Sequence, residues 1–151
     1  MRNMSFKISD KMRELCTRIN NNTESGKLDF WDTYYFCSVI GMTKMKFGDK
    51  EELTEFNKQY AASYSSLRHS IAAMLVTAEI NRRGQEIERD NITSVFKKFI
   101  DENSSLILNN DGLSTLDRYA EGGLQLIIER GSRIVDRIQF LRTCKEIIDE
   151  E

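Results

Sequence analysis

The segment from Leu113 to Gly131, LSTLDRYAEGGLQLIIERG, has the most regular helical periodicity in the chain. Ser114 and Asp117 have the spacing of a capping box, which predicts a helix start at Ser114. Gly131 suits a left-handed cap at the end of the helix. We expect one face of this helix to be buried against the other elements. The residues of that face are Leu113, Leu116, Ala120, Gly123, Leu124, Ile127 and Ile128.

Two adjacent glycines, Gly122 and Gly123, lie inside this helix. Each costs about 1 kcal/mol relative to alanine in a helix interior, so both need a reason. Gly123 lies on the apolar face, where the missing Cβ allows another backbone to approach closely. Gly122 lies on the opposite face near Tyr119 and Leu126, which leaves open a tolerated surface glycine, a helix kink or a partner contact. We expect Gly122→Leu to leave folding nearly intact and to abolish any partner contact made there.

Residues 28–42, LDFWDTYYFCSVIGM, hold much of the aromatic content of the chain. As a helix, this segment is apolar on two sides, with Trp31 and Tyr35 on the second side. A helix that is apolar all round is buried, either by its own domain or by a partner. Its aromatic and β-branched residues leave a strand open as the alternative.

The remaining segments favour further helices, and the absence of proline suits helices joined by short turns better than an all-β fold. A first helix capped by Ser9 or Asp10 is predicted to end at Asn20–Asn22 and to bury the stripe Met12, Leu15, Cys16 and Ile19. Further helices are predicted after a Ser65 or Ser66 cap and before Gly84, at 91–103 after Asp90, and at 132–150. The inward residues of the last two are predicted to be Ile92, Val95, Phe96, Phe99 and Ile100, and then Ile134, Ile138, Leu141 and Ile148.

Residues 43–60 are charged and irregular, which predicts an exposed excursion with a short helix inside residues 51–60. The sequence therefore predicts an all-α fold, a single-domain bundle of five to six helices spanning residues 1–151. The central and last helices are expected to form an antiparallel pair.

Charge and cysteine content bound the class of protein. The formal net charge of −2 gives no general argument for nucleic-acid binding. No apolar run reaches the 18 residues or so that a membrane helix needs, and the first residues do not resemble a signal peptide. Three scattered cysteines indicate reduced core thiols, so we expect a cytoplasmic protein without a membrane partner.

The chain shows no catalytic motif. Its single histidine, His69, is predicted to be exposed and to lack a positioned partner. One histidine and three dispersed cysteines provide no zinc-ligand spacing, and no glycine-rich phosphate loop is present. We expect a protein that is not an enzyme and that has neither metal nor cofactor. An acidic metal site is the least supported alternative.

Basic residues suggest one alternative function. Arg130, Arg133 and Arg137 are spaced i, i+3, i+7, which is predicted to stack them along one flank of the last helix. Arginine forks on such a flank can contact phosphates, although Glu129, Asp136 and Glu146 reduce the local positive field. The alternative prediction is therefore a helical DNA-binding regulator.

Two blocks together carry a resemblance to a known family. They are KLDFWDTYYFCSVIGM and LDRYAEGGLQLI, with the matching positions Phe36, Gly41, Tyr119, Ala120, Gly123 and Leu124. Their order and separation resemble the small accessory proteins of bacterial Dnd systems, the DNA phosphorothioation and restriction loci of phage defence. The resemblance covers about half the chain and implies a helper in DNA modification or defence, without implying a reaction.

The favoured function is therefore a non-enzymatic accessory or adaptor subunit of a prokaryotic DNA-modification or phage-defence system. It is expected to act through contacts with a protein partner or through a homodimer. The predicted contact residues are Trp31, Tyr35, Tyr119, Gly122 and Leu126.

Overall fold

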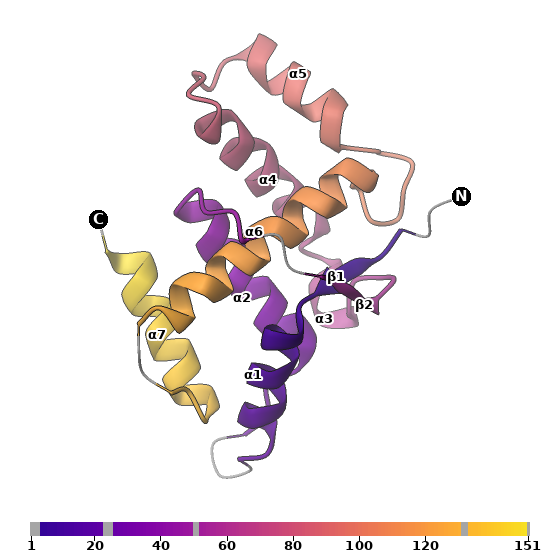
Figure 1. The fold of residues 1–151 in the computed structure, drawn as a ribbon. Helices are drawn as coiled ribbons and strands as arrows, with labels where there is room; N and C mark the ends of the chain where they lie inside the picture. The colour runs from indigo at the N-terminus through magenta and orange to yellow at the C-terminus, as the bar shows by residue number, and fades with distance from the viewer. Residues whose placement is uncertain (1–3, 23–25, 50–51, 131–132, 151) are drawn as a thin grey trace.

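The computed structural model describes residues 4–22, 26–49, 52–130 and 133–150. Within them, the chain forms seven helices and two short strands (Figure 1). The helices are α1 (Asp10–Asn20), α2 (Phe30–Thr43), α3 (Ala62–Ser65), α4 (Arg68–Arg82), α5 (Arg89–Phe99), α6 (Asn110–Ile128) and α7 (Arg137–Asp149). The strands are β1 (Phe6–Ile8) and β2 (Thr54–Asn57). None of the described helices is long and apolar enough to cross a membrane.

Helices α2 and α6 pack along each other at the centre of the molecule (Figure 1). A Cβ atom on Gly123 would lie 1.9 Å from the carbonyl oxygen of Cys37, and one on Gly41 would lie 1.9 Å from that of Tyr119. Only glycine fits at both positions, because these distances are far below van der Waals contact. The predicted close backbone approach at Gly123 is therefore confirmed.

The segment at residues 28–42 contains a helix and not a strand. Asp29 caps α2 by accepting from the Asp32 amide, and Asp32 completes the capping box. Trp31, Tyr34 and Cys37 are all buried, as a helix that is apolar all round requires. The fold of the chain itself buries this helix.

Helix α6 begins earlier than the sequence predicted. The side chain of Asn109 caps it by accepting from the Gly112 amide at 2.8 Å. The predicted cap, Ser114, lies inside the helix, so the predicted capping box is wrong. The predicted C-terminal cap at Gly131 lies outside the described residues.

Two buried acidic side chains of α6 contact β1 and the residue that caps α1. Asp117 accepts from the Tyr34 hydroxyl at 2.7 Å and from the Lys7 amide at 3.2 Å. One turn later, Glu121 accepts from the Ser9 amide at 3.4 Å, and the Ser9 side chain caps α1 as predicted. Burial raises the pKa of Asp117 to about 7, against the effect of its two hydrogen bonds. These contacts hold β1 and the start of α1 on α6.

A two-stranded antiparallel sheet corrects the all-α prediction. Strand β1 pairs with β2, which lies where a short helix was predicted inside residues 51–60. Phe6 and Ile8 of β1 are fully buried while Lys7 between them points outward, the period of two expected for a strand on a core. The pairing joins segments almost fifty residues apart in the sequence. The helical spacing of the residues around Phe56 therefore did not predict the strand.

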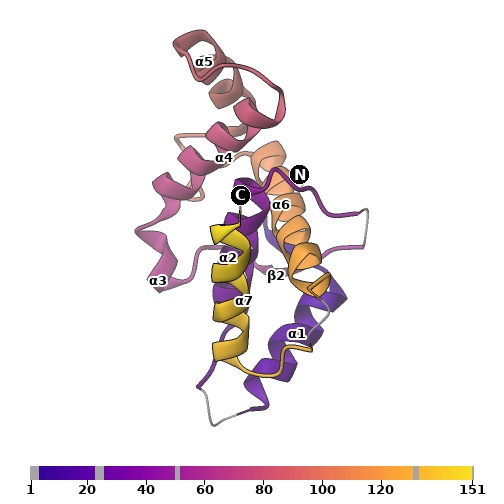
Figure 2. The same ribbon diagram turned by 90° about the vertical axis from the view of Figure 1, so that its left-hand side faces the viewer.

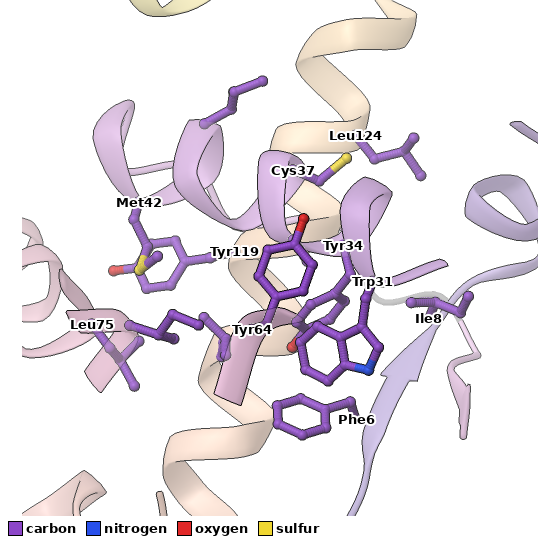
Figure 3. Close-up of a cluster of buried hydrophobic side chains, with 14 of the residues drawn as sticks. Phe6, Ile8, Trp31, Tyr34, Cys37, Met42, Tyr64, Leu75, Tyr119 and Leu124 are labelled. Atoms are coloured by element: carbon purple, nitrogen blue, oxygen red, sulfur yellow. The ribbon is translucent and has the colours of Figure 1, made fainter. Parts of the chain in front are cut away.

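An aromatic cluster lies between the sheet, α2 and the segment that follows β2 (Figure 3). The ring of Trp31 lies 4.5 Å from that of Phe6, 5.3 Å from Phe56 and 5.9 Å from Tyr64, between centroids. Edge-to-face and offset contacts of this kind stabilise beyond the area they bury. The cluster fixes the sheet against α2.

Helix α7 returns beside α2 and α6 (Figure 2), as the predicted antiparallel pairing requires. It begins at Arg137 with Asp136 as its cap, later than predicted, and Ser132 lies outside the described residues. The predicted inward stripe is partly wrong. Ile138 and Ile148 are exposed, whereas the buried residues of α7 are Phe140, Cys144 and Ile147.

Helices α4 and α5 form a hairpin at the end of the molecule away from α1 and α7 (Figures 1 and 2). Gly84, with φ of +68°, follows α4 and confirms the predicted helix end. The N-cap position of α5 is Glu88, which makes no side-chain cap, so the predicted cap at Asp90 is wrong. Only one side of α5 packs on the rest of the fold. Val95 and Phe99 on that side are buried, whereas Ile92 and Phe96 are exposed.

Candidate functional site

The structure buries three of the predicted partner-contact residues inside the chain's own fold. Trp31 belongs to the aromatic cluster, and Tyr119 is fully buried with its hydroxyl donating to Glu79 at 2.8 Å. Gly122 is buried too, since a Cβ there would lie 1.9 Å from the carbonyl oxygen of Lys46. The prediction that Gly122 lies on an outer face is therefore wrong.

The physical reason is the segment that follows α2. Residues 44–49 return across α6, where the Gly48 amide donates to the carbonyl oxygen of Arg118 at 2.9 Å. The ring of Phe47 lies between Arg82 and Arg118, whose guanidinium carbons are 4.5 and 4.1 Å from its centroid. The sequence predicted that this charged stretch is an exposed excursion, yet it covers the face of α6 that carries Gly122.

The other two predicted contact residues are half-buried and separate. Tyr35 packs against Tyr64, with ring centroids 5.0 Å apart, and Leu126 lies near the end of α6. The five predicted residues do not form one surface.

The predicted basic flank is not formed by one helix. Arg130 and Arg133 precede α7, and only Arg137 belongs to it. Arg130 forms an ion pair with Glu150, and the guanidinium of Arg137 lies beside Gly26. Nucleic-acid binding stays a prediction from the sequence. The three arginines, however, do not lie along one flank of a single helix as expected.

Buried acids elsewhere form structural contacts. Glu79 accepts from Arg82 Nε at 2.6 Å and from the Tyr119 hydroxyl. Burial alone would raise the pKa of Glu79, but these hydrogen bonds hold it below its ordinary value. Among the described residues, no group of three potential ligands is placed to hold a metal ion. His69 is exposed, as predicted.

An apolar groove of about 520 Å³ lies between α4 and α5. Its floor on α4 is made of small side chains, Ala72, Ala73, Val76 and Thr77. The hydroxyl of Thr77 donates to the carbonyl oxygen of Ala73 at 3.0 Å, so its hydrogen-bonding need is met within the helix. The groove volume falls in the range of 300 to 1,000 Å³ that is typical of ligand-binding clefts.

Large apolar side chains of α5 and the preceding turn form the wall of the groove. The exposed fractions are 58% for Ile87, 39% for Ile92 and 37% for Phe96. Scattered exposed apolar residues are ordinary, but three beside one groove mark a candidate binding surface. Sequence reasoning missed this surface by assigning Ile92 and Phe96 to the core. The sequence did contain a signal for this surface. Residues 92–100 include five apolar side chains, which is more than one inward face of a helix needs.

The groove has two chemically different ends. Ile80 and Ile87 lie at the hairpin turn and are apolar. His69, in the first turn of α4, and Glu102, just after α5, lie at the other end. Of the residues that the structure describes, Glu102 is the only carboxylate lining the groove, and no lysine or arginine lines it.

A second hollow of about 370 Å³ lies on the other side of α4 and contains Met42, Met45 and Met74. Ala73 and Thr77 line both hollows, so they form a low ridge between two apolar depressions. Methionine side chains adapt to irregular partners. Small and apolar side chains of α4 therefore line hollows on both of its sides.

Comparisons of the chain with protein-family models, curated proteins and solved structures gave no match.

Proposed function

We propose that this protein is a non-enzymatic adaptor that binds a partner protein through the groove between α4 and α5. The observation that carries the proposal is the exposure of Ile87, Ile92 and Phe96 beside a floor of small residues. Helix-in-groove recognition uses this arrangement, because large side chains of one amphipathic helix enter an apolar channel.

The dimensions of the groove suit a helix. His69 and Ile80 line its two ends and are eleven positions apart on α4, which at 1.5 Å per residue spans about 16 Å. That length accommodates about three turns of a partner helix. Small floor residues such as Ala73 allow the partner backbone to approach α4 closely, while Phe96 packs against its side.

The cellular setting is part of the same proposal. The resemblance to Dnd-associated accessory proteins supports a role in a DNA-modification or phage-defence complex. Cys16, Cys37 and Cys144 are buried free thiols, which supports a cytoplasmic location.

The proposal is tested with one groove substitution and a matched control. Phe96→Glu places a charge in the groove, whereas Ser94→Glu adds the same charge at an exposed position on α5 that does not line it. Tagged wild-type protein and both variants are expressed in the native host, and the proteins recovered with each are quantified. Every candidate is then tested for direct binding as a purified protein.

We expect a partner that binds wild-type protein and Ser94→Glu but not Phe96→Glu. Thermal unfolding of all three proteins, followed by circular dichroism, checks that the variants are folded. Equal recovery of every partner by both folded variants would show that the groove is not the binding surface. Light scattering after size-exclusion chromatography would reveal a second copy of the chain as the occupant.

A further inference from the structure

The two ends of the groove differ in charge, which constrains what binds there. Glu102 supplies a carboxylate at one end, while Ile80 and Ile87 make the other end apolar. Among the described residues that line this end of the groove, Glu102 therefore carries the negative charge.

The carboxylate of Glu102 is not used within the fold. Glu102 is exposed, and among the described residues it forms no hydrogen bond or ion pair. The nearby lysine Lys98 instead places its amine 5.4 Å from the ring of Phe99. His69, the other ionisable residue of this end, also has no partner in the described part of the chain.

We infer that the groove binds an amphipathic helix with a lysine or arginine at the end that lies over Glu102. This inference rests on the proposed function and adds the chemistry and orientation of the occupant. The apolar face of the helix lies along Ala73 and Val76, and its basic side chain extends past Ile100 to the carboxylate. A helix bound in the opposite direction needs its basic residue at its other terminus, so the charge also selects a direction.

The size of the effect follows from exposure. An exposed ion pair contributes about 0.2 to 1 kcal/mol, which is about a 1.4- to fivefold change in the dissociation constant. Glu102→Gln is therefore expected to weaken a selected basic helix by up to about fivefold. Glu102→Lys is expected to weaken it further, because it places like charges together. Both effects should diminish as salt is raised.

The test uses a display library of sixteen-residue amphipathic helices in which the residues at both ends are randomised. The library is selected in parallel on wild-type protein and on Glu102→Lys, after removal of peptides that bind Phe96→Glu. Selected peptides are synthesised, and their dissociation constants are measured by fluorescence anisotropy at low and high salt.

We expect lysine or arginine at one terminal position in wild-type binders, and aspartate or glutamate there in binders of Glu102→Lys. If peptides require Phe96 but show no charge preference, the inference is overturned while the proposed function stands. If no selected peptide distinguishes wild-type protein from Phe96→Glu, both fail. If the protein forms a dimer in which a second copy of the chain fills the groove, the inference is overturned, because the occupant is then not a separate basic helix.

Discussion

Replacing Asp117 by asparagine should remove a pH dependence that is built into the fold. Asp117 is buried, and burial raises the pKa of its carboxyl group to about 7. The unfolded chain has a value near 3.9. Since the folded state holds the proton more tightly, the stability linked to Asp117 is fully present below about pH 4. It is lost as pH rises through about 7.

The magnitude follows from the difference between these two values. About three pH units correspond to about 4 kcal/mol in total, of which about 2.5 kcal/mol is lost between pH 5 and pH 8. Asparagine keeps an oxygen that can accept from Tyr34 and Lys7, and it cannot ionise. Glu79 has the opposite sign, because its pKa is lowered, and its contribution is lost only below this window.

The assay is urea unfolding at four pH values from 5 to 8, followed by the fluorescence of Trp31, the single tryptophan of the chain. Wild-type protein should lose about 2.5 kcal/mol more than Asp117→Asn over this range. Asp111→Asn, an exposed position on the same helix, is the matched control and should keep the wild-type slope. Parallel profiles for wild-type protein and Asp117→Asn would refute the conclusion that Asp117 is held neutral in the fold.

Two further predictions concern packing. Gly122→Ala should destabilise the protein by about 1 to 3 kcal/mol, because the added Cβ meets the backbone of Lys46 and must displace residues 44–49; an unchanged urea midpoint would contradict the close contact. Cys37 and Cys144 should react with a thiol reagent only after unfolding, because burial raises the pKa of Cys37 well above its usual range and that of Cys144 to about 12; rapid labelling of the native protein at pH 8 would show that the α2–α7 contact opens readily.

Local signals in the sequence were sufficient where the stabilising partners are close along the chain. The cap at Ser9 and the buried stripe Met12, Leu15, Cys16 and Ile19 of α1 follow from neighbours three or four residues apart. The close approach at Gly123 was also predictable, because a glycine on the apolar face of a helix leaves room for a second backbone and fills little space itself.

The errors arose where distant segments decide the environment. Gly122 is buried only because residues 44–49 return across it, and nothing near Gly122 in the sequence shows this. The pairing of β1 with β2 is equally non-local. Helical periodicity likewise cannot show which apolar residues of a helix are covered by other elements. Ile92 and Phe96 were therefore predicted to be core residues, although no element of the described structure covers them.

The attachment of β1 to α6 also bears on how the chain folds during synthesis. The Lys7 amide and the Asp117 carboxylate are 110 residues apart, and the Ser9 amide and the Glu121 carboxylate are 112 residues apart. Strand β1 leaves the ribosome long before α6 exists, so Phe6 and Ile8 remain without their final cover until α6 emerges. Between the synthesis of β1 and that of α6 the nascent chain therefore exposes these apolar residues, and the central core is completed only after α6 has emerged.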